Sequence, residues 1–195
     1  MHPTARLTVL VTLLALTSMP ALAHTGEGVG GLASGFLHPV TGLDHVVAMV
    51  AVGLWGGILG KPALWMLPVA FPLVMAFAGA LGVMQVPLPG VETGIALSGI
   101  VLGLMVLFAA RPPLWMALVL VAAFAVFHGH AHGAELPESA NPVAYSLGFV
   151  VATGLLHLAG IAIGLLVKWP AGRVAVRGTG ALIALAGGAF LTGLA

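Results

Sequence analysis

Two short motifs place imidazoles and carboxylates inside an otherwise apolar sequence. HPVTGLDH opens one apolar segment and FHGHAHGAE closes another. Their ionisable side chains are His38, Asp44, His45, His128, His130, His132 and Glu135. Ionisable groups at bilayer depth are costly, and they usually line a pathway or bind a ligand. Imidazole combined with carboxylate favours Ni²⁺, Co²⁺, Zn²⁺ or Cu²⁺ over Mg²⁺ and Ca²⁺, so the motifs predict a transition-metal site.

The composition is that of a membrane protein. Of the 195 residues, 61% are hydrophobic and only 6% are charged, and the mean hydropathy is +1.18. The net charge of +1 provides no basic stripe for nucleic acid, and the sequence contains no GxxxxGKS or GxxxxGKT loop for a nucleotide. Because the chain has no cysteine, thiolate metal sites, Fe–S clusters and cysteine catalysis are excluded.

Residues 1–23 have the features of a secretory signal peptide. Arg6 supplies a positive charge, residues 7–16 form an apolar core, and the sequence Ala-Leu-Ala ending at Ala23 is a small-residue cleavage pattern. We expect cleavage there, which leaves His24 at a periplasmic N-terminus and residues 24–195 as a single transmembrane domain. The alternative is an uncleaved first transmembrane helix.

The predicted mature chain contains six apolar segments separated by turns rich in glycine and proline. A helix that crosses a bilayer needs about 20 mostly apolar residues. The segments are 42–59, 63–84, 92–110, 114–130, 142–169 and 175–194. We therefore predict an all-α, polytopic membrane helix bundle of about six transmembrane helices, with a Gly-rich amphipathic stretch over 30–38 before the first.

Glycine and proline inside these segments affect how the helices pack. Gly-x-x-x-Gly pairs, which allow close approach of helix backbones in lipid, begin at Gly53, Gly99 and Gly160. Pro68 and Pro72 each remove a backbone hydrogen bond, so we expect a kinked or opened helix over 63–84. The freed carbonyls either line a pore or are satisfied by neighbouring helices.

The charged residues predict the orientation in the membrane. Lysine and arginine fall in alternate loops, which the positive-inside rule assigns to the cytoplasm. These residues are Lys61, Arg111, Lys168, Arg173 and Arg177, whereas Glu27, Glu92, Glu135 and Glu138 fall on the other side. We thus predict a multi-pass inner-membrane protein with both ends outside. Both motifs and Glu92 would then meet near the periplasmic face.

The first motif allows more than one role for its acid. His38 precedes Pro39, which disfavours helix at that point, and a break there would let His38, Asp44 and His45 converge. Asp44 then either binds a dication or orients a ligating imidazole from behind. The competing interpretation is that Asp44 only caps the first transmembrane helix. Two neighbouring histidines favour metal binding.

The second motif and one lone histidine add further candidates. His128 and His132 are spaced i, i+4 with Glu135 three residues later, so a helix places all three along one stripe. His130 points elsewhere. A solvated His-rich loop is the alternative for this motif. His157, in the middle of segment 142–169, is either a buried hydrogen-bonded histidine or a deeper relay. Glu92 is either a metal-path acid or a helix N-terminal acid.

At these residues the chain resembles the HupE/UreJ family of nickel permeases. The family motif HPxxGxDH matches residues 38–45, and FHGxAHGxE matches residues 127–135 without a departure. The signal peptide, the mature start His-Thr-Gly at His24 and the helix count also match, so the resemblance covers nearly the whole chain. It implies Ni²⁺ uptake that serves hydrogenase or urease maturation. It also implies metal-path roles for His38, Asp44, His45, Glu92, His132 and Glu135, and a role for Phe71.

We therefore expect a permease that carries Ni²⁺ from periplasm to cytoplasm, not an enzyme, with no permanently bound cofactor. The full set of expected metal residues is His38, Asp44, His45, His132, Glu135, His128, Glu92 and His157. The expected partners are a divalent metal ion and the lipid bilayer, and a homo-oligomer is compatible with the sequence. Alternatives are transport of Co²⁺ or another dication, a haem b electron-transfer protein, and a membrane metal hydrolase with Glu135 as base.

Overall fold

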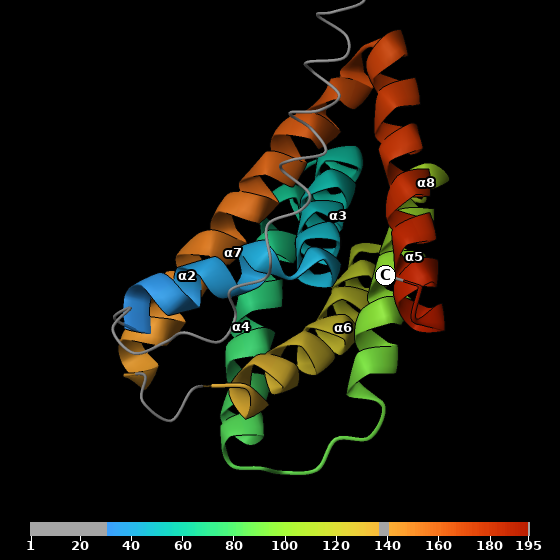
Figure 1. The fold of residues 1–195 in the computed structure, drawn as a ribbon. Coiled ribbons are helices and arrows are strands. Elements are labelled where there is room, and N and C mark those ends of the chain that lie inside the picture. Colours follow the sequence, from blue (N-terminus) through green and yellow to red (C-terminus); the bar gives the residue numbers. More distant parts are fainter. Residues whose placement is uncertain (1–30, 137–140, 195) are drawn as a thin grey trace, which may run out of the picture.

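The computed structural model describes residues 31–136 and 141–194, and in those ranges every regular element is a helix (Figure 1). The helices are α2 (Gly31–Thr41), α3 (Leu43–Leu59), α4 (Ala63–Val83), α5 (Val91–Leu107), α6 (Leu114–Ala134), α7 (Pro142–Gly164), which continues into a short 3-10 turn η1 (Leu165–Lys168), and α8 (Pro170–Thr192). The all-α prediction is confirmed. The predicted signal peptide, His24, Glu27 and Glu138 lie outside the described residues.

The helices have the lengths of a polytopic membrane protein. Four of them, α4, α6, α7 with η1, and α8, are long and apolar enough to cross a bilayer alone. α2 and α3 pass the same test only together, and they are bent by 79° at the break between them. α5 is apolar but has 17 residues. The six predicted segments therefore correspond to four full spans, one broken span and one short apolar helix.

The break in the first span lies at Gly42 and not at Pro39, where the sequence predicted it. α2 continues through Pro39 and ends two residues later, and the missing N–H removes one backbone bond, the one to the Gly35 carbonyl oxygen. The Thr41 hydroxyl then donates to the carbonyl oxygens of Leu37 and His38 at 3.1 Å each, which satisfies the end of α2. Gly42 is extended, with φ −82° and ψ 105°, and α3 begins at the next residue.

Close contacts at glycines join the helices into three pairs: α3 with α7, α5 with α8, and α4 with α6. Gly53 of α3 lies against Gly160 of α7, and Gly57 lies against Gly164. Between α5 and α8 the corresponding contacts are Gly99 with Gly187 and Gly103 with Gly180, and between α4 and α6 they are Gly79 with Gly133 and Gly82 with the His130 carbonyl. The three Gly-x-x-x-Gly motifs therefore serve helix packing, as predicted.

Two helices differ from the prediction in ways that matter for the site. α6 continues beyond residue 130 to Ala134, because its glycines pack closely on α4 and keep the polar end of the helix buried. α4 stays helical through Pro68 and Pro72, so the predicted opening of that helix is wrong. Proline at position 72 still leaves the Pro68 carbonyl oxygen without its helical partner.

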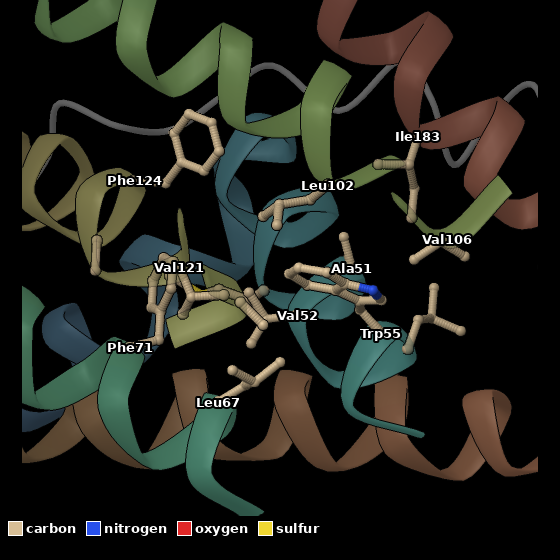
Figure 2. Packing of buried hydrophobic residues seen from close by; sticks show 14 of the residues in the cluster. Ala51, Val52, Trp55, Leu67, Phe71, Leu102, Val106, Val121, Phe124 and Ile183 are labelled. Carbon is tan, nitrogen blue, oxygen red and sulfur yellow. The ribbon is translucent and has the colours of Figure 1, made fainter. Parts of the chain in front are cut away.

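The hydrophobic core lies between α3, α4, α5, α6, α7 and α8, and Figure 2 shows Trp55 among its side chains. The indole N–H of Trp55 donates to the Ala110 carbonyl oxygen at 2.9 Å, so the one polar atom of this buried ring is satisfied. Beside it, the Arg177 guanidinium donates to the Leu107 carbonyl oxygen at 2.7 Å. A cation is favourable at the C-terminal end of a helix.

The ends of the bundle separate basic from acidic residues. In Figure 1 the α3–α4 and α7–α8 turns, which carry Lys61 and Lys168, lie at the upper end, and the α4–α5 connection lies at the lower end. The C-terminus of α6, where Glu135 follows, also lies at the lower end. This arrangement agrees with the charge pattern. The assignment of the basic end to the cytoplasm stays a prediction of the positive-inside rule.

Replacing Gly160 with alanine should weaken the α3–α7 contact, because the new Cβ would collide with the Val50 carbonyl oxygen. We expect a loss of about 1–3 kcal/mol in stability, as for other overpacked interiors. Thermal unfolding of the purified protein in detergent measures this. Gly154→Ala on the same helix is the matched control, since nothing lies within 4 Å of its new Cβ. Equal melting temperatures for the two variants would contradict this packing.

Candidate metal site

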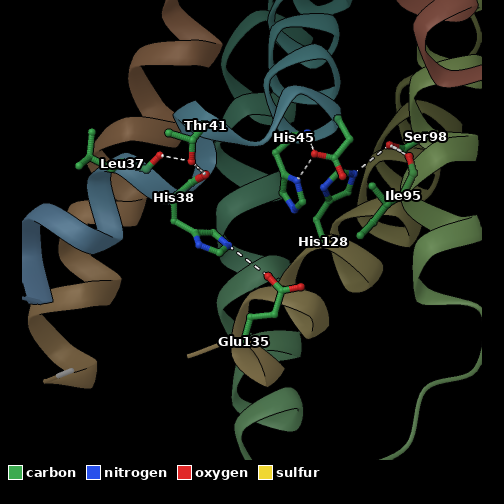
Figure 3. A network of polar contacts seen from close by, with 9 residues as sticks. Leu37, His38, Thr41, His45, Ile95, Ser98, His128 and Glu135 are labelled. Carbon is green, nitrogen blue, oxygen red and sulfur yellow. Dashed lines mark hydrogen bonds and ion pairs between the residues drawn. The ribbon is translucent and has the colours of Figure 1, made fainter. Parts of the chain in front are cut away.

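The two motifs meet inside the bundle, where the break at Gly42 turns the start of α3 toward α6. His38 comes from α2, Asp44 and His45 from the first turn of α3, and His128 and His132 from the last turns of α6, with Glu135 as its C-cap residue. Figure 3 shows His38, His45, His128 and Glu135 gathered from these helices. The predicted convergence of His38, Asp44 and His45 with the second motif is therefore present.

Three side chains form a set that we call the outer triad: His38, His132 and Glu135. Each offers one ligand atom, and these atoms all lie within 4.8 Å of one another. The His38 Nε2 to Glu135 Oε2 distance is 3.3 Å. With metal–ligand bonds of about 2.1 Å, two ligands on opposite sides of an ion are about 4.2 Å apart. If the two most distant ligand atoms approached each other by roughly 0.6 Å, the outer triad could therefore hold a cation.

The outer triad runs from an exposed acid to a buried imidazole. The Glu135 side chain is 54% exposed and that of His38 is 32% exposed, whereas His132 is 5% exposed. The hydrogen bond from the His38 imidazole holds the pKa of the Glu135 carboxyl below its usual value. Glu135 is therefore a carboxylate at neutral pH, and a cation arriving from that end of the bundle meets a negative charge first.

Asp44 is bound to its neighbour and not to the outer triad. Its Oδ1 accepts from the His45 backbone N–H at 2.8 Å and from the His45 ring Nδ1 at 2.7 Å. Because the N-cap of α3 is Gly42, Asp44 is not the cap residue of that helix. Of the roles that the sequence left open, this geometry favours the one in which the carboxylate orients an imidazole.

His128 is held by a residue that sequence reasoning missed. Its Nε2 lies 2.8 Å from the Ser98 hydroxyl oxygen, and that hydroxyl also lies 2.6 Å from the Ile95 carbonyl oxygen of α5. Both His128 and Ser98 are completely buried. The only sequence signal was a hydroxyl within the apolar segment 92–110, which is too common to single out.

Several imidazole nitrogens of the cluster are buried without a partner. Within the described part of the chain, the nitrogens that lack any hydrogen-bond partner include His45 Nε2, His128 Nδ1 and both ring nitrogens of His132. An unpaired polar atom of this kind costs about 1–3 kcal/mol. Buried nitrogens that converge and remain unpaired are typical of a site that binds something.

His132 lies at the centre of the cluster. Its ring centroid is 4.8 Å from that of His38 and 4.2 Å from that of His45, and His45 is in turn 4.8 Å from His128. The Phe149 ring covers another side of His132 at 4.2 Å. A cavity of about 210 Å³ between α4, α6 and α7 reaches His132, and its lining is mostly apolar.

The cluster lies below the end of the bundle and His157 lies deeper. Phe149, which covers His132, is seven residues after the start of α7, or about 10 Å along the helix. His157 is eight residues further, or about 12 Å deeper. Phe71 of α4 bridges this interval, with its ring 5.6 Å from His128 and 5.5 Å from His157. His128 is as fully buried as His157, but burial does not measure depth along the bundle, and the role of His157 as a deeper candidate stays a prediction.

His157 faces a backbone oxygen of α4. Its imidazole lies near the Pro68 carbonyl, which Pro72 leaves without a helical partner. Neither ring nitrogen of His157 reaches full hydrogen-bonding geometry with any described residue. The geometry is compatible with both predicted roles, a structural histidine and a deeper relay.

Two other predicted residues lie outside the cluster. The His130 Nε2 is 2.6 Å from the Val86 carbonyl oxygen, so this ring contacts the α4–α5 connection. This agrees with the prediction that His130 points elsewhere. Glu92 is exposed in the first turn of α5, and the ion pairs and hydrogen bonds found among the described residues of the cluster do not include it. A metal role for Glu92 stays a prediction.

Together, the broken first span and the buried imidazole–carboxylate cluster define a polytopic membrane protein with a candidate metal site in its interior. The family described as HupE / UreJ protein matches residues 11–190. The chain is also 45% identical over 186 residues to Protein HupE of Rhizobium leguminosarum bv. viciae. The matched region covers 94% of this chain and 97% of that relative. The chain therefore belongs to the HupE/UreJ family. No solved structure matches it.

Replacing His132 with alanine should weaken metal binding at least about 10-fold, because it removes the imidazole that lies between His38 and His45. Equilibrium dialysis of the purified protein with Ni²⁺ measures this affinity. His130→Ala is the matched control on the same helix, since that ring contacts Val86 and should leave the affinity unchanged. If both variants lost affinity equally, the cluster would not be the binding site.

Proposed function

We propose that this protein is a Ni²⁺ uptake permease of the bacterial inner membrane, which moves the metal from periplasm to cytoplasm for hydrogenase or urease maturation. The observation that carries the proposal is the outer triad: two imidazoles and a carboxylate converge within 4.8 Å inside a polytopic helix bundle. Such a ligand set suits borderline dications and not Mg²⁺ or Ca²⁺.

Family membership supports the same class of function. The HupE/UreJ family supports a nickel or cobalt transport role linked to hydrogenase or urease, and its members are accessory proteins of the transporter type. The choice of Ni²⁺ over Co²⁺ and the inward direction are our proposal. The direction follows from the charge pattern, which predicts that the exposed Glu135 faces the periplasm.

The geometry suggests how hydrated Ni²⁺ would enter. The Glu135 carboxylate lies at the exposed side of the outer triad and attracts the cation, and His38 beside it replaces the first water ligands. The buried His132 then supplies a ligand where water is excluded. Exchange of one ligand at a time keeps the ion coordinated as it leaves water, so the full desolvation penalty of a free dication is avoided.

Loss of the cluster should abolish high-affinity uptake without loss of membrane insertion. We expect Asp44→Asn and His132→Ala to remove Ni²⁺ accumulation, because the first releases His45 from its carboxylate and the second removes the central ligand. Radiolabelled Ni²⁺ uptake in proteoliposomes, with competing Co²⁺ and Zn²⁺ and an imposed pH gradient, tests this. His130→Ala is the control for reconstitution, and wild-type accumulation in either site variant would refute the assignment.

Ni²⁺ binding should weaken as pH falls from about 8 to about 5, because an imidazole must be neutral to ligate a metal. The pKa of Glu135 is lowered, so its carboxylate releases its proton at a lower pH than usual and remains charged over this range. The loss with acidity should therefore persist in Glu135→Gln, although that variant binds more weakly overall. Equilibrium dialysis at graded pH measures this, and binding that strengthens with acidity would argue against histidine ligands.

A further inference from the structure

Three imidazoles lie inward of the exposed carboxylate: His45, His128 and His132. They are 8%, 0% and 5% exposed, so all three are removed from water. Their rings are in sequence, with centroids 4.2 Å apart between His132 and His45 and 4.8 Å apart between His45 and His128. These ring contacts do not involve Glu135, the carboxylate of the outer triad.

The tautomer of His45 follows from its hydrogen bond. A carboxylate only accepts hydrogen bonds, so the Nδ1 of His45 must carry the proton that it donates to Asp44. In a neutral imidazole the other nitrogen then holds a lone pair. That atom, Nε2, is buried and has no partner among the described residues.

The tautomer of His128 follows from Ser98 by the same reasoning. A carbonyl oxygen cannot donate, so the 2.6 Å contact between Ser98 and Ile95 requires the Ser98 hydroxyl to donate to the Ile95 carbonyl. With its one proton used, the Ser98 oxygen accepts from His128 Nε2–H at 2.8 Å. The Nδ1 of His128 therefore holds the lone pair, and Figure 3 shows this nitrogen on the side of the ring that faces His45.

We infer that His45, His128 and His132 form a second metal position inward of the outer triad, and that Ser98 is a positioning residue that presents the His128 Nδ1 to the ion. This inference rests on the proposed function. His132 belongs to both positions, since it lies between His38 and His45 and neither of its nitrogens is bonded elsewhere within the described chain. An ion can therefore pass inward without losing all of its protein ligands at once.

The inner position has a different chemistry from the outer triad. It offers three neutral nitrogen donors, which suits Ni²⁺, Co²⁺, Zn²⁺ or Cu²⁺ and rejects cations that require oxygen ligands. Its negative charge is supplied indirectly by Asp44 through His45. The outer triad is the only set of described ligands that already lies within 4.8 Å, so the rings of the inner position must move toward an ion as it arrives.

The test isolates the inner position by removing the outer carboxylate with Glu135→Gln. Purified Glu135→Gln protein, loaded with Ni²⁺ alone, should retain a bound ion whose X-ray absorption spectrum shows three imidazole ligands. Adding Ser98→Ala should weaken this binding about 10-fold or more, as loss of a group that orients a metal ligand does. Ser98→Thr, which keeps the hydroxyl, should restore it.

Ser34→Ala is the matched control, because the Ser34 hydroxyl donates in the same way to the carbonyl three residues earlier, that of Gly31. It should leave the affinity of Glu135→Gln unchanged. Equal affinity with and without Ser98→Ala, or fewer than three imidazoles around the bound ion, would overturn the inner position. If Ser98→Ala lowers thermal stability, its affinity is not used, and the number of imidazoles around Ni²⁺ in the Glu135→Gln protein decides whether the inner position exists. These binding measurements need no transport, so absence of Ni²⁺ uptake by the wild type would reject the proposed function separately.

Discussion

The free-energy cost of an unpaired polar group away from water is the constraint on which this structure depends. Imidazoles and carboxylates can be brought inside a helix bundle only if the backbone that carries them keeps its own hydrogen bonds. The break at Gly42 meets this condition, because the Thr41 hydroxyl and the start of α3 satisfy the chain on either side of it. The 79° bend between α2 and α3 lies beside His45, which is buried.

The same constraint explains how the side chains of the cluster are ordered. Two of the imidazoles are held from behind, with Nδ1 of His45 bonded to Asp44 and Nε2 of His128 bonded to Ser98. Among the described residues of the cluster, the atoms without partners are His45 Nε2, His128 Nδ1 and both ring nitrogens of His132. The unpaired nitrogens are therefore concentrated in one place, where a cation can satisfy several of them together.

Sequence patterns predicted the helices and the identity of the cluster because both depend on local rules. Apolar segments gave the helices, and the spacing of His128 and His132 placed them on one face. The break at Gly42, the length of α6 and the role of Ser98 could not be predicted, because they depend on contacts between distant helices. Pro39 was the stronger local signal for a break, but α2 stays helical through it and packs on α7, with Gly35 and Gly148 at the contact.

The glycine contacts have a consequence for movement. Direct backbone contacts at Gly53 and Gly160, and at Gly79 and Gly133, oppose sliding within each helix pair, so each pair can be regarded as one packed body. The bend of α2 onto α7 adds that helix to the first body, through Gly35 and Gly148. His38 and His45 belong to this body, and His132 belongs to the body made by α4 and α6. Ser98 belongs to the third body, made by α5 and α8. A relative movement of these bodies would therefore change the distances between the ligand atoms directly.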